Sequence, residues 1–73
     1  MRKLSNTDIG EFVTVHSIDS KGLLRERMLA LGLTKGALVE VVHRGPSGDP
    51  TVYDIRGAMI ALRKEEACLI EVS

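Results

Sequence analysis

Short strand-like segments separated by glycine are the feature that most limits how this 73-residue chain can fold. Each segment places β-branched, aliphatic or tyrosine side chains at alternate positions and ends in turn residues, which is typical of β-strands. We expect five of them, at residues 11–18, 37–43, 51–56, 58–63 and 68–72. Five short strands with tight turns favour a small, partly open β-barrel, because curling the sheet covers edges that so small a domain cannot otherwise protect.

Residues 23–31 change from the period of a strand to that of a helix. Asp19 and Ser20 can cap its start, and Gly32 lies where a left-handed cap would end it. Residues 64–67, KEEA, are too short and too charged for more than a helical turn. An apolar stripe at i, i+4 and i+7 is expected to pack the helix over one opening of the barrel. It consists of Leu24, Met28 and Leu31.

The chain is short enough to be one domain, residues 1–73, with a single core. Only 3% of its residues are aromatic, so the core must be built mainly from aliphatic side chains. The inward positions of the five strands predict ten core residues. They are Val13, Val15, Val39, Val41, Tyr53, Ile55, Ile60, Leu62, Ile70 and Val72.

Charge and hydropathy exclude several classes of function. Ten basic and ten acidic residues give a net charge of zero and a pI near 6.7, which argues against nucleic-acid binding because such binding depends on a positive field. The apolar runs are far too short to cross a bilayer, and the N-terminus lacks the apolar region of a signal peptide. We therefore expect a cytoplasmic chain with no membrane insertion.

The segment GPSGDP at residues 45–50 raises the question of a phosphate-binding loop. A P-loop needs a Lys-Ser/Thr pair after its last glycine and a helix that points its N-terminus at the phosphates. Here a strand-like segment follows, and Pro46 and Pro50 remove two backbone donors. We expect a hairpin connection that binds no nucleotide, with Asp49 hydrogen-bonded inside the loop.

No residue pattern predicts catalysis or a resident metal or cofactor. His16, His43 and Cys68 are ligand types for transition metals, but they have none of the local spacings of metal sites. Cys68 begins the apolar face of the last strand, so we expect a buried, unligated thiol. Nothing brings a nucleophile, a base and an acid together, so we expect no enzyme.

The helix carries the most informative surface. Arg25, Arg27 and Leu29 lie off the apolar stripe and form a mixed basic and apolar face of the kind that binds another protein. The alternative is that Leu4 and Ile9 fold back and cover Leu29. The sequence leaves both interpretations open.

An ordered set of segments resembles the ferrous iron transport protein A (FeoA) family across nearly the whole chain. The segments are RMLALGL (27–33), KG (35–36), VEVV (39–42), GPSGDP (45–50), RG (56–57) and IALRKEEACLIEV (60–72). The resemblance implies a mostly β fold, a small SH3-like β-barrel of about five strands with one inserted short α-helix.

The resemblance also implies a function. It predicts a small cytoplasmic accessory protein of bacterial ferrous iron uptake, which binds and modulates the membrane GTPase transporter ferrous iron transport protein B and is peripheral at the inner membrane through that partner. The alternative is an SH3-like regulatory module of the kind fused to iron-dependent transcriptional repressors. The expected partner-binding residues are Arg25, Arg27, Leu29, Gly32, Leu33, Pro46 and Asp49.

Overall fold

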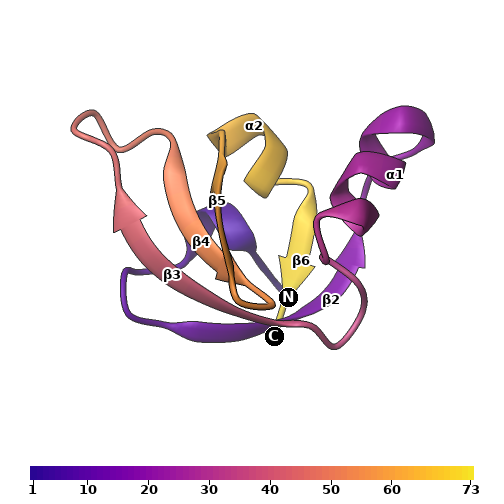
Figure 1. Cartoon of the computed structure of the whole chain (residues 1–73), viewed down its shortest axis with the longest axis horizontal. Helices are drawn as coiled ribbons and strands as arrows, with labels where there is room; N and C mark the ends of the chain where they lie inside the picture. The colour runs from indigo at the N-terminus through magenta and orange to yellow at the C-terminus, as the bar shows by residue number, and fades with distance from the viewer.

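The computed structural model describes residues 1–73 and consists of six strands, two α-helices and one 3-10 helix (Figure 1). In chain order the elements are β1 (Arg2–Lys3), η1 (Leu4–Asn6), β2 (Phe12–Ile18), α1 (Gly22–Ala30), β3 (Leu38–Arg44), β4 (Thr51–Ile55), β5 (Ala58–Leu62), α2 (Lys64–Ala67) and β6 (Ile70–Val72). None of the helices is long and apolar enough to cross a membrane.

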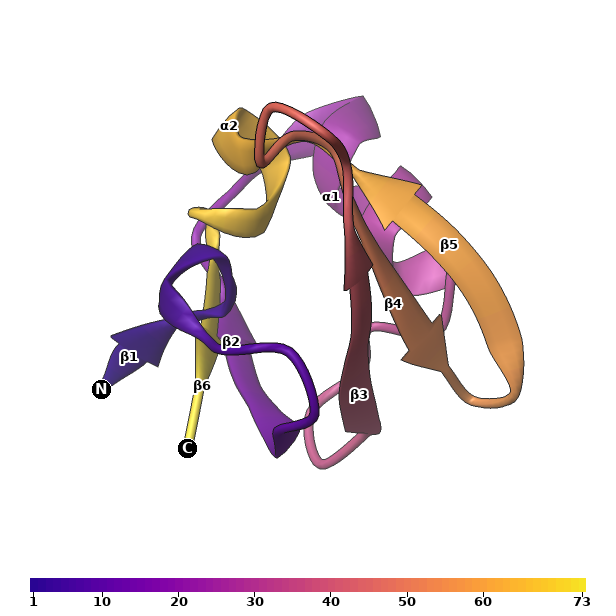
Figure 2. The same ribbon diagram turned by 90° about the vertical axis from the view of Figure 1, so that its left-hand side faces the viewer.

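The six strands form one antiparallel sheet in the order β1-β6-β2-β3-β4-β5. The sheet curls so that β2, β6, β3 and the β4–β5 hairpin surround a common interior (Figure 2). Register shifts between Val15 and Ser17 in β2, and between Val41 and His43 in β3, mark bulges of the kind that increase strand curvature. The outer strands β1 and β5 do not pair with each other, so the predicted partly open barrel is confirmed, with six strands instead of five.

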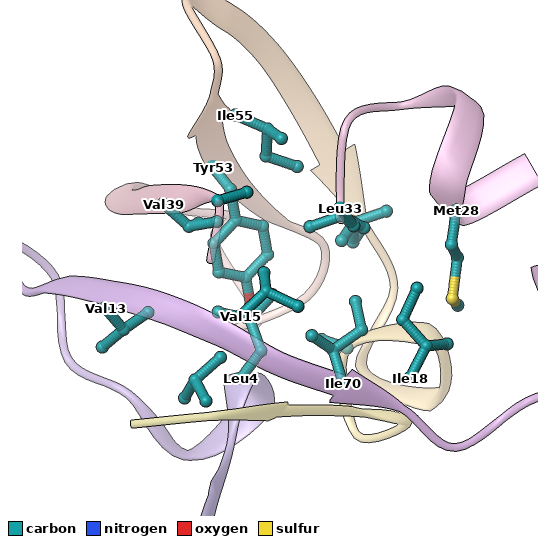
Figure 3. Close-up of a cluster of buried hydrophobic side chains, with 14 of the residues drawn as sticks. Leu4, Val13, Val15, Ile18, Met28, Leu33, Val39, Tyr53, Ile55 and Ile70 are labelled. Carbon is teal, nitrogen blue, oxygen red and sulfur yellow. The ribbon is translucent and has the colours of Figure 1, made fainter. Parts of the chain in front are cut away.

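The core confirms the alternation pattern, because nine of the ten predicted residues are buried. The exception is Ile60, which is partly exposed because β5 is an edge strand and has a neighbour on one side only. Six residues from outside the predicted set complete the core. The largest are Leu4, Met28 and Leu33, each 0% exposed, and the others are Ile18, Ala37 and Ala67. Figure 3 shows Met28 reaching from α1 toward Ile18 and Ile70.

The N-terminal segment contains two elements that the sequence analysis missed. β1 pairs with β6 through Arg2–Val72 and Lys3–Glu71, and the short η1 that follows buries Leu4. The Thr7 hydroxyl donates a 2.7 Å hydrogen bond to the Leu4 carbonyl. A two-residue strand carries no alternation, which is why no sequence pattern revealed it.

Helix α1 has the expected place in the chain but packs differently from the prediction. Of the predicted stripe only Met28 is buried, while Leu24 is 37% exposed and Leu31 packs against the edge of the core. The expected caps at Asp19 and Ser20 are also wrong, because the N-cap is Lys21 and no side chain caps the helix. The C-terminal cap is as predicted: Gly32 adopts φ +100°, and the Leu33 amide donates to the Met28 carbonyl at 3.1 Å.

The GPSGDP segment connects β3 to β4 as a hairpin, as expected. Inside it the Gly45 amide donates to the Pro50 carbonyl at 2.9 Å and the Gly48 amide donates to the Gly45 carbonyl at 2.8 Å. The single helical turn predicted at KEEA is α2. The β3–β4 loop, α2 and α1 lie along the same end of the barrel (Figure 1).

Candidate functional site

Helix α1 is the most exposed element of secondary structure. Met28 is its only buried residue among nine, and Leu23 is 83% exposed. A helix this short is not stable in water on its own, so it depends on its attachments to the barrel. Besides Met28, these are two arginines: Arg25 Nη1 donates to the Ile18 carbonyl at 3.1 Å, and Arg27 pairs with the Glu66 carboxylate of α2. The helix therefore holds most of its surface in water.

A hollow of about 180 Å³ lies between α1 and β2, and we call it the α1 hollow. It is lined by Val15, His16, Ser17, Ile18, Arg25, Leu29, Leu33 and Lys35. The lining combines aliphatic side chains with two cationic residues, Arg25 and Lys35, and contains no carboxylate. The chemistry of this hollow suits an apolar group that has an acidic neighbour.

Leu29 is 37% exposed and lines this hollow. The alternative in which Leu4 and Ile9 cover it is wrong, because Leu4 belongs to the core beneath α2 and β6 and Ile9 is 56% exposed. Leu33, expected on the partner surface, is 0% exposed and belongs to the core. Leu33 is nevertheless one of the residues that line the hollow, from the core side.

The predicted residues of the β3–β4 loop lie apart from the α1 hollow. Pro46 is exposed and Asp49 is partly buried. The expectation that the Asp49 side chain bonds inside the loop is wrong: its Oδ1 accepts the Lys64 amide at 2.9 Å, and its Oδ2 lies 3.8 Å from Arg63 Nη1. Within the loop, Asp49 accepts a hydrogen bond only through its main-chain carbonyl, from the Ser47 hydroxyl at 3.3 Å. Asp49 thus fastens the loop to the start of α2.

Polar contacts connect the two groups of predicted residues through α2. Glu66 accepts the Arg63 amide at 3.0 Å and pairs with Arg27 of α1. These contacts hold the pKa of the Glu66 carboxyl below its usual value, with the Arg63 backbone hydrogen bond the largest cause and Arg27 the next. The loop, α2 and α1 are therefore tied together along one end of the barrel.

Sequence reasoning missed Arg44, at the end of β3. Its Nη2 donates to the Thr7 carbonyl at 2.6 Å, while its buried Nε has no hydrogen-bond partner. It borders a second hollow, of about 290 Å³, under the β3–β4 loop, together with Asp49 and Tyr53. Burial raises the pKa of the Tyr53 phenol there. In the sequence, an arginine at the end of a strand cannot be told from an arginine that is exposed to solvent. No sequence pattern could therefore have identified Arg44.

The three candidate metal-ligating residues are not brought together. His16 and His43 are exposed on different strands, and no group of three or more His, Cys, Asp or Glu side chains is close enough to hold a metal ion. The prediction of a buried Cys68 is wrong: it is partly exposed and follows α2 as its C-cap, with Sγ 3.2 Å from the Glu65 carbonyl. β6 begins two residues later, so the thiol is outside the alternating strand.

Comparison with known proteins gives matches over almost the entire chain. A family model described as the FeoA domain matches residues 2–73. The Fe(2+) transport protein A/Fe(2+) transporter FeoB fusion protein of Porphyromonas gingivalis (strain ATCC BAA-308 / W83) is 33% identical over 70 residues. That match covers 96% of this chain but only 8% of the fusion protein.

Solved structures agree in fold. Iron(II) transport protein A from Clostridium thermocellum has a TM-score of 0.94 at 38% identity, covering 99% of this chain and 44% of that one. FeoA from Stenotrophomonas maltophilia, solved with zinc and described as a prokaryotic SH3 domain protein, has a TM-score of 0.89 at 27% identity, covering 100% and 91%.

A manganese-dependent transcriptional repressor shares the fold, with a TM-score of 0.87, covering 99% of this chain and 40% of that one. Its identity is 22%, so this likeness shows the fold alone and leaves the regulatory alternative a prediction. The family match extends over nearly all residues, and the mostly β barrel with its inserted helix is the SH3-like fold named for the Stenotrophomonas protein. The chain belongs to the FeoA family.

Proposed function

We propose that this chain is a cytoplasmic accessory protein of bacterial ferrous iron uptake, and that it binds the cytoplasmic part of a FeoB-type transporter through α1 and the α1 hollow. The iron path and GTP hydrolysis belong to the transporter, and this chain supplies a docking surface that modulates it. The fusion relative supports the pairing, since its name joins an FeoA part and a FeoB part in one polypeptide.

The exposure of α1 is the observation that carries the proposal. Leu24 and Leu29 are each 37% exposed on a helix with one buried residue, and Leu29 borders a hollow that contains two cationic side chains. Because Leu29 is 37% exposed, burying the rest of its side chain stabilises a complex by about 0.5–1 kcal/mol, and arginine beside it is among the residues enriched at binding hot spots. We therefore place Leu29 at the centre of the interface, with Arg25 beside it.

The experiment uses two substitutions of the same kind on the same helix. Leu29→Asp places a carboxylate in the α1 hollow and should abolish co-purification with the transporter of the same organism and reduce ferrous iron uptake. Leu24→Asp is the matched control, because Leu24 is equally exposed but does not line the hollow. That variant should bind and support uptake like the parent.

Both variants should melt within a few degrees of the parent, since neither leucine is a core residue. A carboxylate near the end of a helix costs about 0.3–1 kcal/mol through the helix dipole, so Leu29→Gln serves as an uncharged second variant. The proposal fails if folded Leu29→Asp and Leu29→Gln proteins both still bind the transporter and support uptake. Equal loss of binding in the Leu24 and Leu29 variants would also contradict the α1 hollow as the contact.

A further inference from the structure

The outer face of the sheet carries a third hollow, of about 350 Å³, which shares no residue with the α1 hollow. We call it the outer-face hollow; it is lined by Phe12, Leu38, Glu40, Asp54, Arg56 and Gly57. Alternation along β2, β3 and β4 places Phe12, Leu38, Glu40 and Asp54 on the face opposite the core, and Arg56 and Gly57 follow in the β4–β5 turn. Strand register aligns four residues in one row across β2, β3, β4 and β5. The row is Phe12, Glu40, Asp54 and Met59.

Apolar side chains lie at both ends of the row and beside it, and they remain in water. Phe12 is 62% exposed, Leu38 is 55% exposed and Met59 is 63% exposed. Phe12 is also the only phenylalanine of the chain. Large apolar side chains that gather on one face of a small domain, instead of occurring singly, are typical of binding surfaces.

The carboxylates between them lack a compensating cation. Glu40 and Asp54 are register partners on neighbouring strands, and like charges in that position destabilise a sheet. Neither forms an ion pair within the chain; the four that exist involve other carboxylates. Arg56, the one cation in the lining, instead donates to the Gly32 carbonyl at 3.2 Å and to the Thr34 hydroxyl at 2.7 Å.

Two unpaired carboxylates among exposed apolar side chains are complementary to a cation that is carried on an apolar segment. A metal ion fits poorly, because Glu40 and Asp54 are the only carboxylates of the hollow and no third ligand is near. A lysine or arginine side chain fits well. Its methylene stem can cover Phe12 and Leu38, its charge can lie between the carboxylates, and a cation near the Phe12 ring gains a further attraction.

We propose that the outer-face hollow binds an extended segment of a partner protein in which a lysine or arginine is flanked by aliphatic or aromatic residues. This site is independent of the proposed function, since it shares no residue with the α1 hollow. A partner bound here would relieve the repulsion between Glu40 and Asp54 that the free protein carries.

Selection from a random heptapeptide library on the purified chain tests the site. Peptides enriched on the parent, but not on Glu40→Arg, should carry a lysine or arginine between apolar residues. Their binding should weaken with added salt and shift the amide resonances of residues around the hollow in NMR spectra. Enrichment of acidic or purely apolar peptides, or shifts confined to α1, would overturn the proposal.

Glu40→Gln then separates a binding role from a structural one. Glu40 makes no side-chain hydrogen bond, whereas Asp54 accepts the Gly57 amide at 2.9 Å and is better left intact. The variant should bind the selected peptide about two- to fivefold more weakly, as expected for one lost charge pair, with its melting temperature unchanged or higher. Glu26→Gln on α1 is the matched control and should bind normally.

Unchanged affinity of the Glu40→Gln variant would overturn the proposal, as would a fall in its melting temperature that accounts for weaker binding. A titration with zinc alone, followed by the same NMR shifts, compares a metal ion with the peptide. Saturable shifts around Glu40 and Asp54 with zinc, in the absence of any peptide effect, would assign the hollow to a metal ion and contradict the proposal.

Discussion

The barrel and helix α1 contain the same kinds of apolar residue but use them in opposite ways. In the strands, alternate side chains such as Val39, Val41 and Ile55 are 0% exposed. In α1, one residue of nine is buried and the leucines are left at the surface. Since burial of apolar area is the main source of folding free energy, the barrel supplies the stability and α1 is supported by it. A region that contributes little to stability is free to specialise for binding.

Replacing Leu33 should have the largest effect, because it tests the barrel side of this contrast. Leu33→Ala removes a fully buried side chain and should cost about 2–5 kcal/mol, a large part of the stability of a domain this small. Leu23→Ala is the control, since Leu23 is 83% exposed and should change stability by no more than about 0.5 kcal/mol. Urea unfolding measures both, and equal midpoints would show that Leu33 is not a core residue.

Replacing Met28 tests whether α1 depends on one side chain. Met28→Ala should cost about 2 kcal/mol, at the low end for a buried methionine, because little else on the helix is packed. The loss should be local. Amide hydrogen exchange should accelerate more for Leu31 and Leu33, whose amides cap the helix end, than for strand amides. Uniform acceleration across the chain would show that helix and barrel unfold as one unit.

Glu66→Gln should have the smallest effect, and a pH-dependent one. The folded pKa of Glu66 lies below its usual value of 4.5, so the ionised carboxylate contributes stability above that pH. This contribution is lost as the pH falls through the lower folded value. The difference in unfolding free energy between parent and variant should therefore be largest near neutral pH and shrink below about 4.5.

The control for this measurement is Glu26→Gln, which removes an exposed carboxylate that forms no ion pair. Its difference from the parent should stay small at every pH. A Glu66→Gln difference that persists unchanged in acid would mean that the link between α1 and α2 does not depend on charge.

The sequence predicted the barrel well because its signals are local. Alternation identifies Val13, Val41 and Tyr53 as inward without knowledge of their neighbours, and Gly32 ends α1 through its own backbone freedom. Ile60 fits the same alternation but is partly exposed, since the pattern does not say which strand will be at the edge.

The candidate sites were harder to predict because they depend on contacts between distant segments. From its position after the helix, Leu33 was predicted to lie on the surface, and only the fold shows that its side chain is in the core. The outer-face hollow needs Phe12 next to Glu40 and Glu40 next to Asp54, a relation set by the register of three strands. Arg27 and Glu66 are likewise brought together by the fold. Periodicity within a segment carries no information about such pairs.

The position of β6 determines when the domain can finish folding. β3, β4 and β5 pair with their sequence neighbours, so the contacts of this meander are local and can form early. β6 instead inserts between β1 and β2, and its Ile70 and Val72 are core residues. Bringing these distant segments together carries the largest loop-closure entropy, so we expect β6 docking to limit the folding rate. During synthesis, the interior of the hairpins would stay open on one side until the three residues of β6 are made and pair with β2.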